Sequence, residues 1–158
     1  MGSPCLIKMN IVIGSDHHGK ELREYISGVL KSKGYGIIDV GYRGSGSCDY
    51  PDYARKAVRV ILSGRAERGV LICGTGIGMS ISANKYPGIR AALVCNERMA
   101  YFAARHNFAN VLCIGSTTGR SATIRIIKTW LETPFEGGRH KRRVDKISRK
   151  EKEHIQQK

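Results

Sequence analysis

The sequence lacks a long apolar run, a paired-cysteine motif and a secretion signal. Its apolar stretches are only a few residues long, whereas a membrane-spanning helix needs about 20, so we expect no membrane partner. The N-terminus shows no charged start followed by an apolar segment, so nothing indicates secretion. The five cysteines are odd in number and form no C-x-x-C pair. This pattern argues against a disulfide framework or a zinc site and favours the reducing cytoplasm.

Two common nucleotide-binding signatures are also missing. The glycines at 74, 76 and 78 do not complete G-x-G-x-x-G, because its third glycine would fall at Met79. No G-K-[ST] sequence forms a P-loop. We therefore expect no cofactor and no metal ion.

Positive charge is abundant: 27 Lys and Arg face 13 Asp and Glu, a formal net charge of +14. The last twenty residues alone hold nine basic and three acidic side chains. Nucleic acid is the first partner that such an excess suggests. However, no aromatic-rich strand or recognisable nucleic-acid motif accompanies the charge, so we expect small phosphorylated molecules and no nucleic acid.

The chain repeats one unit, in which a short apolar run leads through a turn into a helical stretch. The predicted strands cover 11–13, 37–40, 70–73, 91–94 and 111–114. In the first helix, the apolar face consists of Leu22, Tyr25, Ile26, Val29 and Leu30. Continuously apolar strands that alternate with helices predict a parallel sheet covered on both faces. The fold class is therefore α/β: a single Rossmann-like three-layer domain with a five-stranded parallel sheet.

The predicted domain covers residues 9–143. Residues 1–8 are predicted to be a disordered leader. Residues 144–158 predict a basic C-terminal helix with a thin apolar face, which needs a surface to pack on. We expect a partner subunit to provide that surface.

Two glycine-containing loops, residues 14–19 and 73–80, follow the first and third strands. Ligands of open α/β sheets bind at these strand ends. Glycine residues without side chains leave the backbone accessible beside a helix N-terminus. Several backbone amides can then point at phosphate or at an enediolate oxygen. Cys73 lies where the third strand meets its loop, and a helix N-terminus favours the thiolate form of a cysteine. A small buried packing residue explains Cys73 equally well. Cys5, Cys48, Cys95 and Cys113 have no such setting and are interpreted as packing or surface residues.

Polar residues elsewhere could complete a site. Asp16 and His17 end the first strand, where a carboxylate and an imidazole suit proton transfer or sugar binding, although Asp16 would also suit a capped turn. Arg139 and Arg143 are four residues apart, so on a helix they share one face that suits phosphate. His106 ends the fourth helix, where a surface histidine is the alternative.

Together these pieces resemble ribose-5-phosphate isomerase type B, in the family that includes galactose-6-phosphate isomerase. The resemblance extends from about Met9 to about Ile155. The motifs that carry it are Gly14-Ser15-Asp16-His17-His18-Gly19, Asp49-Tyr50-Pro51, Ile72-Cys73-Gly74-Thr75-Gly76-Ile77-Gly78, Ala83-Asn84-Lys85, Gly88-Ile89-Arg90-Ala91, Arg105-His106-Asn107 and Glu136-Gly137-Gly138-Arg139-His140.

The resemblance implies a metal-free aldose–ketose isomerase that interconverts ribose 5-phosphate and ribulose 5-phosphate. It implies Cys73 as the base, with Thr75 and the amides of residues 74–78 (Gly74, Thr75, Gly76, Ile77 and Gly78) on the enediolate oxygens. His106 would assist ring opening with Asp16. The sugar would be contacted by His17, Tyr50 and Asn107, and the phosphate by Arg139 and Arg143. A homodimer or tetramer is implied, with His106 and Asn107 reaching into the partner's site.

The sequence also departs from the family's pattern. The family often has an arginine two residues after the glycine that ends the fifth strand, but here that position is Thr117, and Arg120 is the nearest arginine. Two alternative functions stay open at this stage. One is isomerisation of a six-carbon sugar phosphate, galactose or allose 6-phosphate. The other is non-enzymatic binding of nucleotides or nucleic acid.

Overall fold

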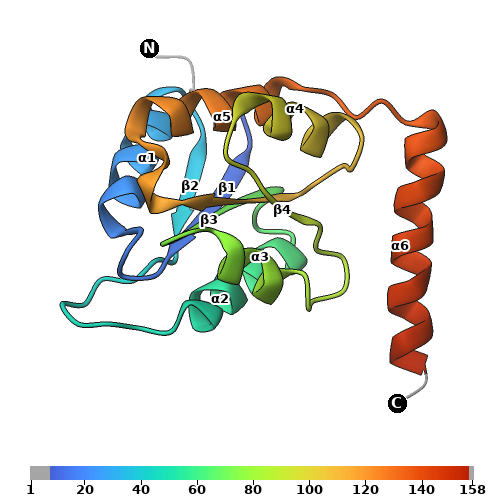
Figure 1. Cartoon of the computed structure of the whole chain (residues 1–158), viewed down its shortest axis with the longest axis horizontal. Coiled ribbons are helices and arrows are strands. Elements are labelled where there is room, and N and C mark those ends of the chain that lie inside the picture. Colours follow the sequence, from blue (N-terminus) through green and yellow to red (C-terminus); the bar gives the residue numbers. More distant parts are fainter. Residues whose placement is uncertain (1–7, 157–158) are drawn as a thin grey trace, which may run out of the picture.

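Five short strands form the sheet in the computed structural model, which describes residues 8–156 (Figure 1). They are β1 (Asn10–Ser15), β2 (Gly36–Asp39), β3 (Arg68–Cys73), β4 (Ala91–Leu93) and β5 (Val111–Gly115). All four strand pairings are parallel, and the order is β2-β1-β3-β5-β4. The predicted five-stranded parallel sheet of a Rossmann-like domain is therefore confirmed. Apart from Lys8, the predicted leader lies outside the described residues.

Helices cover both faces of the sheet. Those of the described chain are α1 (Lys20–Ser32), α2 (Tyr50–Leu62), α3 (Ile77–Ala83), α4 (Glu97–Arg105), α5 (Arg120–Glu132) and α6 (Gly138–Gln156). Buried side chains of α1, α4 and α5 share one core cluster, and those of α2 and α3 share the other. The sixth helix begins six residues before the predicted boundary at 144 and stands at one side of the domain (Figure 1). Within residues 8–156, no helix combines the length and the apolar character that crossing a membrane requires.

Alternating strand residues supply the two cores, because neighbouring side chains of a strand point to opposite faces. Ile72 packs in the core under α1, α4 and α5, whereas Leu71 and Cys73 pack in the core under α2 and α3. β3 lies between β1 and β5, so the loops that leave these three strands share one edge of the sheet. This arrangement positions the candidate site.

The first helix differs from its predicted apolar face, most clearly at Tyr25 and Arg23. Tyr25 was placed on the buried face, but it is 37% exposed, and the Arg120 guanidinium carbon lies 5.1 Å from its ring centre. Arg23 instead is buried. Its Nη1 donates to the Ser15 hydroxyl at 2.8 Å and to the Tyr42 carbonyl at 2.7 Å. Its Nε lies 3.1 Å from an oxygen of Asp39, so one cation joins three segments.

Replacing the buried guanidinium tests this joint. Arg23→Met keeps the side-chain volume but removes one ion pair of Asp39 and the donor to the Ser15 hydroxyl and the Tyr42 carbonyl, and we expect a loss of about 3 kcal/mol in the free energy of unfolding. The control is Arg55→Met, which breaks an exposed ion pair with Asp52 and should cost less than about 1 kcal/mol. Urea denaturation measures both; equal losses would contradict a special role for Arg23.

Candidate active site

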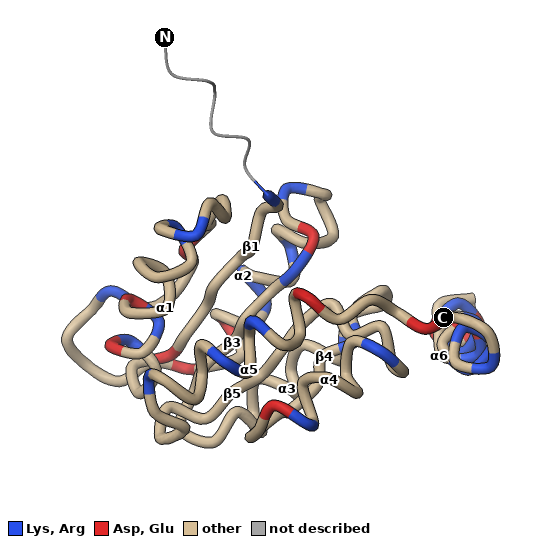
Figure 2. Tube along the Cα trace, turned by 90° about the horizontal axis from the view of Figure 1, so that it is seen from above, with Lys and Arg blue, Asp and Glu red and all other residues tan. Residues whose placement is uncertain are grey.

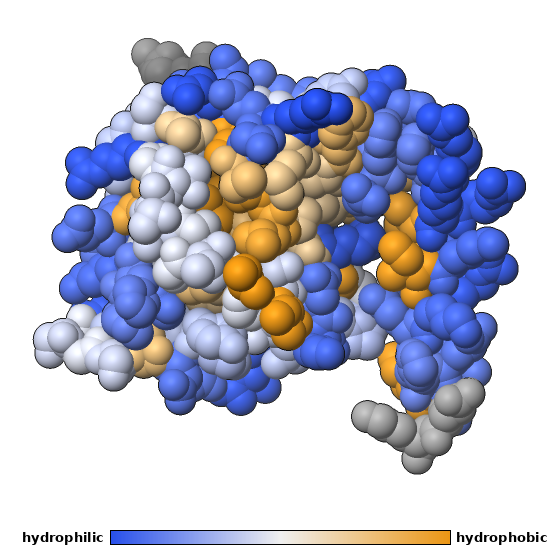
Figure 3. All heavy atoms as spheres, in the orientation of Figure 1, coloured by the Kyte–Doolittle hydropathy of each residue, from blue (hydrophilic) through white to orange (hydrophobic). Residues whose placement is uncertain are grey.

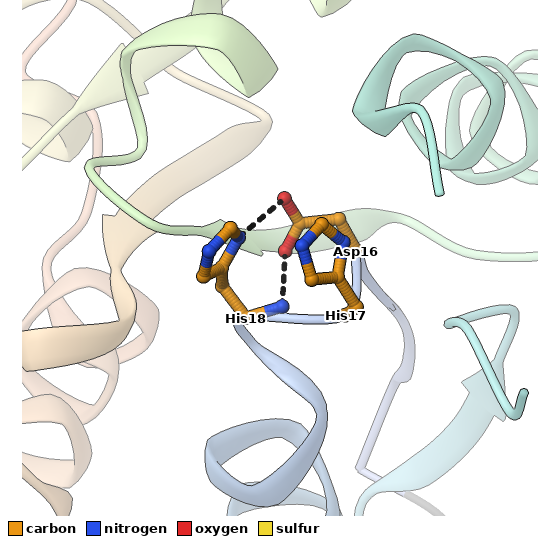
Figure 4. A group of neighbouring side chains, drawn as sticks. All are labelled: Asp16, His17 and His18. Carbon is orange, nitrogen blue, oxygen red and sulfur yellow. Dashed lines mark hydrogen bonds and ion pairs between the residues drawn. The ribbon is translucent and has the colours of Figure 1, made fainter. Parts of the chain in front are cut away.

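Asp16 anchors the loop after β1. One of its carboxylate oxygens accepts hydrogen bonds from the His18 amide at 3.0 Å and the Gly19 amide at 3.2 Å, just before α1 begins. Its second oxygen lies 3.6 Å from Nδ1 of His18 (Figure 4). The carboxylate is therefore a turn cap, as the simpler interpretation has it, and the second oxygen is the one available for other chemistry.

His17 is oriented by a backbone amide from a distant loop. Its Nδ1 accepts a hydrogen bond from the Cys48 amide at 3.2 Å, which leaves the ring proton on Nε2. Burial raises the pKa of the Cys48 thiol, whose sulfur lies 3.8 Å from the same nitrogen. Cys48 therefore contacts a predicted site residue, whereas the sequence had indicated only packing or surface.

Cys73 ends β3 with its sulfur inside the domain, and the residue is 5% exposed. The Gly76 amide donates a hydrogen bond to that sulfur at 3.1 Å. Gly76 has a φ of +80°, and an added Cβ would lie 3.0 Å from the Ile114 carbonyl carbon. Only glycine therefore permits the turn that aims this amide at the sulfur. Cys73 is thus buried, and its sulfur accepts a hydrogen bond from a backbone amide that the loop points at it.

The remainder of this loop meets the β1 loop and the start of α2. An added Cβ on Gly78 would lie 2.6 Å from the Tyr50 ring, and one on Gly74 would lie 4.0 Å from the His18 ring. The exposed Thr75 accepts a hydrogen bond from the Ile77 amide at 3.2 Å, so its own hydroxyl proton stays free to donate. The structure therefore gathers Asp16, His17, Tyr50, Cys73 and residues 74–78 at one edge.

A pocket of about 240 Å³ opens beside this edge. It is lined by residues of the β1 loop, of α1 and of the segment after β5, namely His17, His18, Glu21, Leu22, Ser116, Gly119 and Arg120. His18 and Arg120 were not among the predicted site residues. The exposed Thr117 is not part of the lining.

His106 belongs to a second cluster, where α4 ends and α6 begins. Its ring stacks on that of His140, with centres 3.9 Å apart and planes 4° apart. Carboxylate oxygens of Glu136 lie 3.7 Å from His106 Nε2 and 3.8 Å from His140 Nε2. Arg105 fixes the same carboxylate through an ion pair of 2.8 Å. The sequence predicted His106 but missed Glu136 and His140, although both lie in the quoted Glu-Gly-Gly-Arg-His motif.

This second cluster has the residue types of a metal site but not its geometry. Nitrogen lone pairs lie in the plane of an imidazole ring, so two parallel stacked rings do not aim them at one ion. The guanidinium of Arg139 also donates to His140 Nε2 at 3.4 Å. We therefore assign the cluster to side-chain positioning.

The predicted site residues thus fall into two groups within one chain. His106, Asn107, Arg139 and Arg143 lie around the end of α4 and on α6, at the opposite side of the domain from the start of α1 (Figure 1). Lys and Arg residues, drawn blue, make up much of α6 where it stands apart (Figure 2). The structure does not bring Arg139 and Arg143 to the Cys73 loop of the same chain.

The second cluster makes stability depend on pH. Burial, followed by His106, Arg139 and Arg143, lowers the pKa of His140 below its ordinary 6.5, while Glu136 opposes the shift. The unfolded chain then takes up a proton at higher pH than the folded chain, so this contribution to stability is present above pH 6.5 and is lost as pH falls. His140→Gln should lose less unfolding free energy than the wild type between pH 7.5 and pH 5.5 in urea titrations. An equal loss in both proteins would contradict the assignment.

Known proteins resemble this chain in both sequence and structure. The family described as Ribose/Galactose Isomerase matches residues 11–147. Ribose-5-phosphate isomerase B of Escherichia coli is 40% identical and is aligned over 87% of this chain and 93% of its own length. The structure of Clostridium thermocellum ribose-5-phosphate isomerase B superposes with a TM-score of 0.90 at 48% identity, covering 92% of this chain and 99% of the other. That of the Mycoplasma genitalium enzyme with bound ribulose 5-phosphate gives 0.88 at 44%, covering 93% and 99%.

Proposed function

The chain belongs to the ribose/galactose isomerase family, and we propose that it interconverts ribose 5-phosphate and ribulose 5-phosphate. Relatives and structural neighbours that it matches over most of its length are ribose-5-phosphate isomerases B, one of them with bound ribulose 5-phosphate. The observation that carries the mechanism is the hydrogen bond from the Gly76 amide to the Cys73 sulfur. At 3.1 Å this amide orients the sulfur that the proposed mechanism uses as its base.

The chemistry moves one carbon-bound proton. In the open-chain aldose, the Cys73 thiolate removes the proton from C2, and the electron pair forms the C1–C2 double bond of a cis-enediolate. The resulting thiol returns that proton to C1, while the hydroxyl proton passes from O2 to O1. The product is the ketose and the thiolate is regenerated. Thr75 and the amides that open α3 are the donors for the negative oxygens, because the first turn of a helix leaves its amides without carbonyl partners.

The remaining groups bind the sugar. His17 presents an Nε2 proton to a sugar oxygen, and the exposed ring of Tyr50 borders the Cys73 loop. The thiol base requires a reducing compartment, which is consistent with a cytoplasmic enzyme.

A second copy of the chain completes the site in this proposal, because His106, Asn107, Arg139 and Arg143 lie apart from Cys73. Asn107 lines two open grooves of about 410 and 400 Å³, the first of them closed on one side by Ile147 and Glu151 of α6. The spheres of Figure 3 show apolar groups on the side of α6 that faces the domain, across a hollow. Exposed Leu93, Met99 and Phe102 add apolar surface around the second groove. A homodimer or tetramer would cover these surfaces and insert His106 into the partner's site.

Cys73→Ala tests the base. Since a positioned acid or base contributes about 10²- to 10⁴-fold, we expect turnover of ribose 5-phosphate to fall by at least about 100-fold. Calorimetry should still detect binding of ribulose 5-phosphate. Cys95→Ala removes an exposed thiol outside the site and serves as the control with wild-type turnover. A wild-type rate in Cys73→Ala would exclude the thiol as the base.

His106→Ala tests ring opening. We expect the variant to lose about 100-fold or more in rate on the cyclic aldose, because assisted proton transfer to the ring oxygen is lost. In the reverse direction the substrate is the open-chain ketose, and binding and proton transfer at C1 should be far less affected in single-turnover measurements. Equal losses in the two experiments would contradict a ring-opening role.

The substrate itself is tested by assaying the wild type, with chelator present, on ribose 5-phosphate and on allose and galactose 6-phosphates. The proposal expects the highest kcat/KM with the pentose. Preference for either six-carbon substrate would replace the proposed substrate and keep the reaction class.

A further inference from the structure

Phe108 has a strained backbone and directly follows His106 and Asn107, the two predicted site residues at the end of α4. Its φ is +48°, and among residues 8–156 it is the only residue other than glycine with a positive φ. Glycine usually takes this left-handed conformation where a helix ends, because a Cβ disfavours it. For a bulky side chain such a φ is an outlier, and strained residues are concentrated at functional sites.

Contacts on several sides hold Phe108 in this conformation. Its ring stacks on that of Phe135, with centres 4.7 Å apart and planes 19° apart. The guanidinium carbon of Arg90 lies 5.1 Å from the centre of the Phe108 ring and that of Arg68 lies 5.9 Å from it, where the negative face of the ring attracts cations. Nε of Arg90 also donates a hydrogen bond to the Phe108 carbonyl at 2.7 Å. These contacts compensate for the strain of the turn.

The turn determines how Asn107 is presented. The Asn107 amide donates to the Phe102 carbonyl at 3.3 Å, and beyond the turn the Ala109 amide donates to the Ala103 carbonyl at 2.9 Å. Within residues 8–156, the exposed side chain of Asn107 makes no hydrogen bond of its own. Its direction at the two open grooves that it lines is therefore set by the backbone on either side of it.

We propose that the left-handed turn at Phe108 positions Asn107 to bind the sugar in the partner's site. The inference rests on the proposed function for the role of Asn107. His106 depends less on the turn, because its ring is held by the stack on His140. A carboxamide, in contrast, must aim both a donor and an acceptor at sugar hydroxyls. Phe108 is thus a positioning residue that acts through its backbone conformation, while its ring compensates for the strain.

Two substitutions that both remove the ring test the turn. Asn tolerates the left-handed conformation, so Phe108→Asn should keep kcat/KM for ribose 5-phosphate within about threefold of the wild type. Val is β-branched and opens the turn, so Phe108→Val should lower kcat/KM about 10- to 100-fold. Phe108→Ala, which disfavours the turn less strongly than Val, should fall between the two. The dissociation constant of ribulose 5-phosphate, measured by calorimetry, should rise about 3- to 10-fold in Phe108→Val but not in Phe108→Asn.

Two controls separate positioning from a loss of stability. Tyr35→Ala removes a partly buried ring next to β2, at the other side of the sheet from β4. It should lower the urea midpoint and leave kcat/KM and binding unchanged. In an Asn107→Ala background the side chain that the turn positions is absent, so adding Phe108→Val should lower kcat/KM by less than about threefold more.

The outcomes separate this inference from the proposed function. If the wild type is active and Phe108→Val keeps its kcat/KM and affinity, the inference is wrong. It is also wrong if Phe108→Asn loses as much as Phe108→Val, or if Phe108→Val loses as much without the Asn107 side chain. If the wild type binds ribulose 5-phosphate without isomerising it, the proposed function is wrong, and weaker binding by Phe108→Val alone still supports the turn. A wild type that neither binds nor isomerises it overturns both.

Discussion

The position of β3 in the middle of the sheet is the constraint on which the candidate site depends. Parallel strands end at the same edge, so the loops after β1, β3 and β5 converge there. Most of the buried side chains in these strands are apolar and belong to the two cores. The chemistry is therefore placed by core packing, and changes in the two helical layers would move the loops before they changed any polar side chain.

Backbone amides are hydrogen-bond partners of the polar side chains at that edge. The Gly76 amide faces a sulfur, the Cys48 amide faces His17 Nδ1, and two amides at the start of α1 face the Asp16 carboxylate. Amides neither titrate nor rotate freely, so they orient the sulfur, the imidazole and the carboxylate with little reorganisation. Such a site needs few charged side chains near the reacting carbons. The permanent charges can then be kept for the far end of the substrate.

Sequence patterns predicted the sheet well because every strand is a short apolar run, and burial on both faces leaves little else in it. They predicted Asp16, His17, Cys73 and the glycine loop for a similar reason, since each lies at the end of a strand or directly after it. The patterns failed where partners come from distant segments. Arg23 is buried because Ser15, Tyr42 and Asp39 surround it, and no local rule for a helix face contains them.

The same limit applies to the site residues that the sequence missed. The stack of His106 on His140 depends on how the segment between α5 and α6 returns to α4, where the Glu136 amide donates to the Arg105 carbonyl at 2.9 Å. That Arg120 lines the pocket beside the β1 loop depends likewise on how distant segments meet, because its position at the start of a helix does not indicate it. One signal did exist: Tyr25 lies on the otherwise buried face of α1, and its exposed ring contacts the Arg120 guanidinium.

The proposed division of the site between two copies has a physical consequence for α6. The basic composition of α6 leaves it little apolar surface with which to pack on its own domain. Most of its length stands apart from the domain (Figure 1). Its contacts with the domain lie at both ends: His140 and Val144 are buried near the helix start, and farther along Glu151 accepts a hydrogen bond from the Gly88 amide at 3.0 Å. The fold therefore positions His106 firmly while leaving the groove beside it open. In the proposed assembly, the surface that binds the second copy and the residues that complete that copy's site are the same, so association and catalysis are coupled.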